Sequence, residues 1–133
     1  MDETYISKIT AKIAKEKGFK IFQDKQYSQG TSKALYNYNE NQCELFKDVY
    51  YAPTQTVLQK WLREVHGIQI EIDSLWSEDM SVIIGYHFSV YKTWEEKVEN
   101  IKNSFKEGYK RFDSYEEALE KALFKALKLI NKI

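Results

Sequence analysis

The chain has 133 residues, in which 20 lysines and arginines balance 20 aspartates and glutamates. Its length predicts one domain over residues 1–133, and a hydrophobic content of 43% is enough for a core without a metal or disulfide. The balanced charge argues against a dedicated nucleic-acid binder, which usually carries a basic excess. The one cysteine excludes an internal disulfide. Because no apolar run approaches the length of a signal core or membrane span, we expect a cytoplasmic protein without a membrane partner.

The first predicted element is a helix over residues 4–17, and Gly18 is its natural stop. Four of its side chains recur at helical spacing and form the predicted apolar face: Tyr5, Ile6, Ile9 and Ile13. Residues 19–22 alternate as a short strand would. Within the polar residues 23–42, the pattern at 34–38 predicts an edge strand.

A central helix is predicted after Pro53, with Thr54 or Thr56 as its cap and Gly67 as its end. Its apolar residues recur at helical spacing: Val57, Leu58, Trp61, Leu62 and Val65. Residues 68–73 then alternate strictly between isoleucine and a polar residue, which predicts a half-buried strand.

A second strand is predicted over residues 81–91, antiparallel to the first and joined to it by a turn at 74–80. One face of this strand carries its larger apolar side chains: Val82, Ile84, Tyr86, Phe88 and Val90. Residues 93–105 have the apolar spacing of a helix, and we predict a further helix there.

The last predicted helix covers residues 114–130, with Ser114 and Glu117 as a capping box. Acidic residues crowd its start and lysines its end, as the helix dipole favours. Its apolar face is continuous: Ala118, Leu119, Ala122, Leu123, Ala126, Leu127 and Ile130.

These elements predict an α+β fold, namely a single two-layer domain in which helices pack on one face of a small antiparallel sheet. We expect the helices on one side because the strands alternate so regularly. The predicted core residues are Trp61, Leu62, Ile70, Ile72, Ile84, Leu119, Leu123 and Leu127.

The polar face of the predicted hairpin carries Glu71, Asp73 and His87. A carboxylate beside a histidine is a usual general-base arrangement, or the beginning of a metal site. However, such a set is common by chance, a catalytic zinc needs three protein ligands, and no HExxH or CxxC spacing is present. We therefore expect no catalytic residue, metal or cofactor, and we expect His87 to face solvent beside Glu71 or Asp73.

A helix, a central helix and a two-stranded hairpin follow one another as in a winged-helix protein. In that alternative the central helix would read DNA with Gln55, Gln59, Arg63 and His66. Two observations weigh against it: the loop around Ser77 is acidic, and no helix is predicted just before Pro53. An ordinary solvated helix face is the preferred interpretation.

Two segments resemble small uncharacterised proteins encoded by bacteriophages, prophages and related mobile elements. These are APTQTVLQKWLREVHGIQIEI at 52–72 and SYEEALEKALFKALKLI at 114–130, together about a third of the chain. The resemblance implies a phage or mobile-element origin in the cytoplasm of a bacterial host. It implies no activity and no site residues.

The leading functional interpretation is a small non-enzymatic accessory protein that binds a protein partner or itself. The alternative is the winged-helix-like nucleic-acid-binding module. A dimer would form through the tyrosine-rich residues 27–51, which include Tyr27, Tyr36, Tyr38, Tyr50 and Tyr51.

Overall fold

The structure is a computed structural model that describes residues 4–92, 99–101 and 111–130. The helices are α1 (Lys8–Glu16), α2 (Glu40–Phe46), α3 (Gln55–His66) and α5 (Tyr115–Lys128). The strands are β1 (Gln26–Ser28), β2 (Leu35–Tyr36), β3 (Val49–Tyr51), β4 (Ile68–Trp76), β5 (Ile83–Lys92) and β6 (Glu99–Ile101). Helices and strands are mixed along the chain, which confirms the predicted α+β class.

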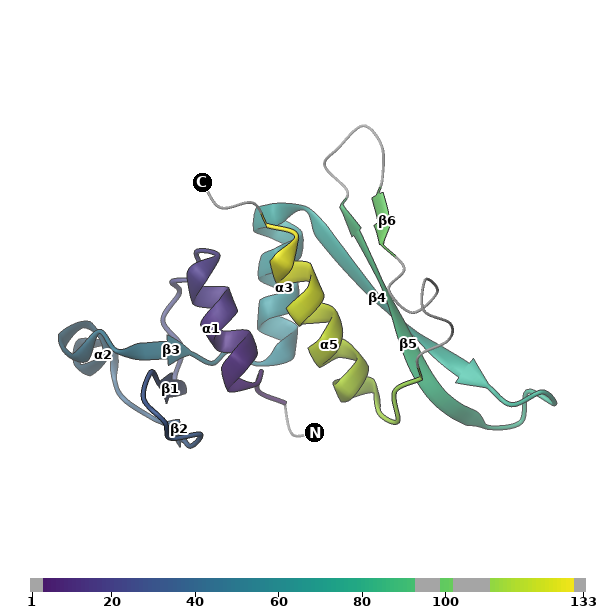
Figure 1. The fold of residues 1–133 in the computed structure, drawn as a ribbon, viewed down its shortest axis with the longest axis horizontal. Coiled ribbons are helices and arrows are strands. Elements are labelled where there is room, and N and C mark those ends of the chain that lie inside the picture. Colours follow the sequence, from purple (N-terminus) through teal and green to yellow (C-terminus); the bar gives the residue numbers. More distant parts are fainter. Residues whose placement is uncertain (1–3, 93–98, 102–110, 131–133) are drawn as a thin grey trace.

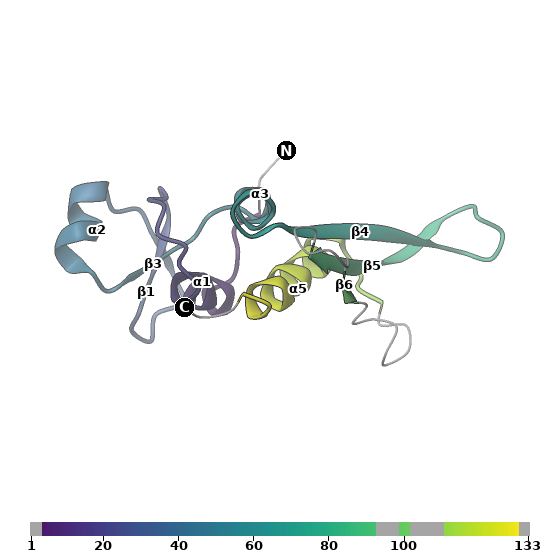
Figure 2. The same cartoon turned by 90° about the horizontal axis from the view of Figure 1, so that it is seen from above.

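The strands form two small antiparallel sheets, with the orders β2-β1-β3 and β4-β5-β6. Helices α1, α3 and α5 pack together between them (Figure 1). The sheet β2-β1-β3 and α2 lie at one end of the molecule, and the β4–β5 hairpin extends away from the helices at the other (Figures 1 and 2). The sequence predicted the β4–β5 hairpin, whereas the sheet β2-β1-β3 was not predicted.

Helix α5 lies at the centre of the core. All seven residues of its predicted apolar face are buried, and they pack with residues of α1, α3, β4 and β5. Its alternating alanines and leucines allow close approach, because alanine leaves room for a neighbouring element to approach the helix axis. From the other elements, Leu58, Leu62, Phe88 and Val90 are fully buried in the same core.

Both predicted ends of α3 and the predicted cap of α5 at Ser114 are confirmed. The Thr54 side chain accepts a hydrogen bond from the backbone N–H of Val57 and begins α3. Gly67, with φ 65°, ends α3 in the left-handed conformation that glycine adopts without strain. Ser114 caps α5 by accepting from the N–H of Glu117 at 3.1 Å.

The predicted first helix was wrong in its start and in its buried face. The residues before Lys8 are extended, and Tyr5 pairs with Thr54 as an isolated antiparallel bridge. The face that packs inward carries Thr10, Ala11 and Ala14, whereas Ile9 is 67% exposed. The inward face has small side chains because α1 lies against both α5 and β3.

The hairpin departs from its prediction near its turn. Strand β4 continues to Trp76, and a β-bulge shifts the register between Leu75 and Trp76. This end of the hairpin extends past α5, so no helix of the described residues covers it (Figure 1). Ile84 is therefore 46% exposed and not a core residue as predicted.

Two other predicted elements were also wrong. Residues 19–22 form no strand, although Phe19 is buried against Trp61 with 5.2 Å between ring centroids. Within the helix predicted at 93–105, residues 99–101 form strand β6 beside β5. The rest of that range lies outside the described residues.

The polar residues 23–42 are ordered by side-chain amides. Gln26 is fully buried, and its amide accepts from the N–H of Tyr38 at 2.9 Å and donates to the Tyr38 carbonyl at 3.0 Å. This pair of bonds holds the segment after β2 against β1, and the edge strand predicted at 34–38 is confirmed as β2. Asn39 and Gln42 then form a capping box that begins α2.

Candidate functional site

The structure brings Asp73 and His87 together, as predicted, on directly opposed positions of β4 and β5. The Nε2 atom of His87 lies 3.9 Å from Oδ2 of Asp73, and Glu71 lies opposite Ser89 one pair further along the same face. The predicted exposure of His87 was wrong, because the residue is only 8% exposed. Among the described residues, no group of three potential metal ligands forms. The opposed positions and the 3.9 Å separation make Asp73 and His87 a cross-strand contact within the hairpin.

The four side chains of the DNA-reading alternative do not share an open face. Gln55 is buried and donates to the Glu116 carbonyl at 2.8 Å, and Gln59 donates to the Ile70 carbonyl at 3.3 Å. His66 packs edge-on against Trp61, and burial lowers the pKa of its imidazole. Arg63 is exposed. The strand β3, not a helix, precedes α3.

The hairpin tip, residues 75–84, exposes large apolar side chains. Five of them have exposed fractions between 44% and 65%: Trp76, Met80, Val82, Ile83 and Ile84. The views in Figures 1 and 2 show this end of β4 and β5 beyond the packed helices. Exposed apolar side chains are usually scattered singly over a protein surface, whereas these five lie within one hairpin end.

A hydrogen-bonded turn orders the tip. One carboxylate oxygen of Asp79 accepts from the Ser77 hydroxyl at 2.6 Å, the Ser81 hydroxyl at 2.7 Å and the Ser81 N–H at 3.1 Å. These bonds lower the pKa of Asp79 to about 2. Met80, at φ 60°, donates its backbone N–H to the Ser77 carbonyl at 2.8 Å. The turn thus holds Met80 in a left-handed conformation at the end of the hairpin.

The chain returns to the hairpin just below the tip. Phe112 and Tyr86 exchange two backbone hydrogen bonds of 2.9 Å, which places Arg111 over Gly85. A Cβ atom at Gly85 would lie 2.2 Å from Cγ of Arg111 and 3.1 Å from the Phe112 carbonyl oxygen. Arg111 also lines a shallow cavity of about 570 Å³ with Leu75, Trp76 and Ile84. Gly85 therefore allows this returning segment to lie directly on β5.

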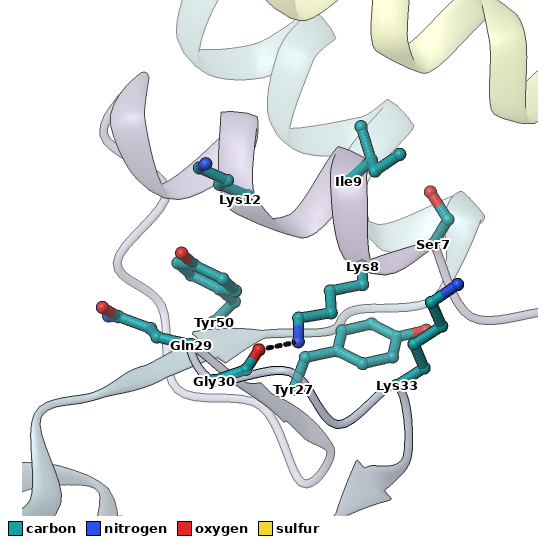
Figure 3. A pocket seen from close by; sticks show the side chains of 9 residues that line it. All are labelled: Ser7, Lys8, Ile9, Lys12, Tyr27, Gln29, Gly30, Lys33 and Tyr50. Carbon is teal, nitrogen blue, oxygen red and sulfur yellow. Dashed lines mark hydrogen bonds between the residues drawn. The ribbon is translucent and has the colours of Figure 1, made fainter.

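A second hollow lies at the opposite end, between α1 and the sheet β2-β1-β3 (Figure 3). We call it the α1 pocket; its volume is about 480 Å³ and its lining residues are Ser7, Lys8, Ile9, Lys12, Tyr27, Gln29, Gly30, Lys33 and Tyr50. The Lys8 amino group donates to the carbonyls of Gly30 and Ser32, each at 2.5 Å, and so ties the β1–β2 loop to α1. Tyr27 donates its hydroxyl to the Ile6 carbonyl at 2.7 Å, and burial, with the nearby Glu120 charge, raises its pKa.

Glu120 joins the three central helices. Its carboxylate accepts from the Ser7 N–H at 3.2 Å, from the Ser7 hydroxyl at 2.9 Å and from the Thr10 hydroxyl, all on α1 or its cap. The Gln55 amide of α3 donates to the other oxygen at 3.3 Å. A negative charge at the start of α1 is favourable because the free N–H groups there carry partial positive charge. Sequence reasoning missed this contact, since Glu120 looked like any acidic residue near a helix start.

The tyrosine-rich segment is largely used within the fold. Tyr27 is buried, Tyr36 stacks on Tyr38 with 5.4 Å between ring centroids, and Tyr51 packs edge-on against Phe22. Cys43 is also buried, and burial, with the Glu40 charge as a smaller cause, raises the pKa of its thiol. A raised pKa disfavours the nucleophilic thiolate.

Comparison with known proteins gives no homologue from which to transfer a function. No protein-family model matches the chain. No curated protein and no solved structure gives a significant match. In the part of the chain that the structure describes, no helix has both the length and the apolar character to cross a membrane.

Proposed function

We propose that this protein is a small non-enzymatic accessory protein that binds another protein through the hairpin tip. The observation that carries this proposal is the exposed apolar cluster of Trp76, Met80, Val82, Ile83 and Ile84 on an ordered turn. Tryptophan and methionine are enriched in protein interfaces, and an ordered tip loses little conformational entropy on binding.

The charged residues around the tip indicate what charge the partner's surface carries. Glu78 and Asp79 lie in the turn beside the apolar residues. No lysine or arginine occurs between residues 68 and 91, although Arg111 lies over Gly85 just below the tip. We infer a partner with an apolar depression bordered by basic side chains, since complementary charge at the rim favours encounter and correct orientation.

Site-specific photo-crosslinking in the native host tests this function. A photoreactive amino acid replaces Met80 in one variant and Leu45, an exposed apolar residue at the other end, in the matched control. We expect one defined protein to crosslink at position 80 and not at position 45. Capture of the same proteins from both positions, or of none from position 80, contradicts the proposal.

A charge substitution sharpens the same test. Trp76→Asp should weaken binding of the identified partner about thirtyfold or more if Trp76 is the central anchor, because truncating such a hot-spot residue costs at least about 2 kcal/mol. Val57→Asp, at a partly exposed apolar residue of α3, serves as the control. Equal loss in both variants would show that the tip is not the contact.

Self-association through the tip is a second candidate, favoured by the zero formal net charge, which gives little repulsion between copies. Light scattering of the wild-type protein and of Trp76→Asp separates the two candidates: a wild-type dimer that the variant dissociates supports self-association. A phage or mobile-element origin, and the nucleic-acid-binding alternative, stay predictions.

A further inference from the structure

We propose that the α1 pocket binds the phosphate group of a small ligand. The pocket is built from three separate parts of the chain: α1 contributes Lys8 and Lys12 on successive turns, and the loop between β1 and β2 contributes Lys33. Tyr27 of β1 and Tyr50 of β3 lie between the lysines (Figure 3). The site lies at the opposite end from the hairpin tip and does not depend on the proposed protein binding.

The pocket concentrates positive charge, and no acidic side chain lines it. Three lysines line it, and its described lining residues include no aspartate or glutamate. Among the described residues, no carboxylate oxygen lies within 4.0 Å of the amino groups of Lys8, Lys12 or Lys33. The Glu120 carboxylate lies beyond Ser7 and is already held by hydrogen bonds from α1 and α3. An anion would therefore neutralise charges that the fold itself leaves uncompensated.

The lysines divide into one that shapes the pocket and two that can reach a ligand. The Lys8 amino group is held by the Gly30 and Ser32 carbonyls and fixes the β1–β2 loop against α1. Lys12 and Lys33 are exposed and stand at opposite sides of the pocket in Figure 3, and their amino groups make no hydrogen bond to the described part of the chain. Both ammonium groups can turn inward when an anion is present.

The lining also fits the ligand class. Lysine is a mobile, compact charge that binds phosphate well, and two lysines match a phosphate dianion in charge. Ile9 and the two tyrosine rings offer apolar surface for the part of a ligand that carries the phosphate. A volume of about 480 Å³ lies in the range of about 300–1,000 Å³ that small-molecule sites occupy.

Isothermal titration calorimetry of the full chain at low salt tests the proposal, with inorganic phosphate and adenosine monophosphate as probes. We expect saturable binding of at least one probe at one site. Lys12→Glu and Lys33→Glu should each weaken it about tenfold, the scale of one lost charge-assisted hydrogen bond. Lys60→Glu, which removes an exposed lysine of α3, should leave it unchanged.

The two probes also distinguish the sources of the phosphate. Equal affinity for both would identify free phosphate as the ligand, whereas tighter binding of the nucleotide would identify a phosphorylated molecule that also contacts the apolar lining. Absence of binding by either probe overturns the proposal. An equal loss of probe affinity in Lys60→Glu also overturns it, because it would mean that the whole surface attracts anions. Binding of a single-stranded oligonucleotide, with neither small probe bound, overturns it in favour of a nucleic-acid surface.

Discussion

The two ends of the molecule differ in charge as well as in architecture. Residues 8–33, which supply α1 and most of the α1 pocket, contain seven lysines and two acidic residues. Residues 68–91, which form nearly all of the β4–β5 hairpin, contain four acidic residues and no lysine or arginine. A formal net charge of zero thus hides two opposite local charges. The balanced composition argues against a dedicated nucleic-acid binder, but it leaves room for a local basic site such as the lysine-lined α1 pocket.

Substitution of Glu120, which joins the three helices between the two ends, should have the largest effect on stability. Replacing Glu120 by alanine leaves the Ser7 N–H, the Thr10 hydroxyl and the Gln55 amide without their shared acceptor. We expect the free energy of unfolding to fall by about 2–3 kcal/mol, since hydrogen bonds to a charged group contribute about 1.5–3 kcal/mol. Urea denaturation measures it. Glu64→Ala, at an exposed acid of α3 away from the helix start, should change it by less than about 0.5 kcal/mol.

Alanine substitutions at two glycines, one in the hairpin and one beside the α1 pocket, compare how tightly the two ends of the molecule are packed. Gly85→Ala should cost about 1–3 kcal/mol, because its Cβ would meet Arg111 and the Phe112 carbonyl oxygen at the hairpin. Gly30→Ala, beside the α1 pocket, should be nearly neutral, since its nearest contact is the Ser28 hydroxyl at 3.4 Å. Thermal unfolding of both variants checks the difference. Equal stability would show that Arg111 moves aside without cost.

The two proposed sites should respond independently to substitution. Lys33→Glu should weaken phosphate binding about tenfold and leave partner crosslinking at position 80 intact, and Trp76→Asp should do the reverse. Calorimetry and crosslinking on the same two preparations measure this. A variant that reduced both activities would indicate one shared site, or a loss of folding that circular dichroism would reveal.

The smallest effect is a change in the hairpin turn with pH. The lowered pKa of Asp79 means that its charged form stabilises the turn. That contribution is complete above the ordinary pKa of 3.8 and is lost as the pH falls towards about 2. The NMR signals of the Ser81 and Met80 amides should therefore shift between these values, whereas signals from the α1 pocket should not. In Asp79→Asn the shift should disappear.

The sequence predicted the elements whose apolar residues recur regularly and whose ends are capped. Helices α3 and α5 and the hairpin belong to this group, because periodicity reports burial directly. Apart from its edge strand, the segment from Gln26 to Phe46 escaped prediction because the buried Gln26 amide and the Asn39 cap order it, and neither produces an apolar pattern. Ile84 is exposed because the hairpin extends past α5, and the length of a hairpin relative to its neighbouring helices leaves no residue pattern.

The candidate sites were harder to predict than the fold. The residues of the α1 pocket come from α1, β1, the β1–β2 loop and β3, and they meet through a sheet that was itself not predicted. The polar sheet face was predicted as a set, and the Asp73–His87 pairing was found, but the burial of His87 was not. Ile84, at the tip, was assigned to the core because alternation alone cannot show where a hairpin outgrows the helices beneath it.

Gly67 alone separates the end of α3 from the start of β4. With a single residue at this junction, the hairpin has no linker in which to swivel, and its direction is set by the packed helices. The same helices support one wall of the α1 pocket. The direction in which the hairpin leaves the core is thus set by one residue, Gly67, and the tip is presented away from the end of the molecule that carries the α1 pocket (Figure 1).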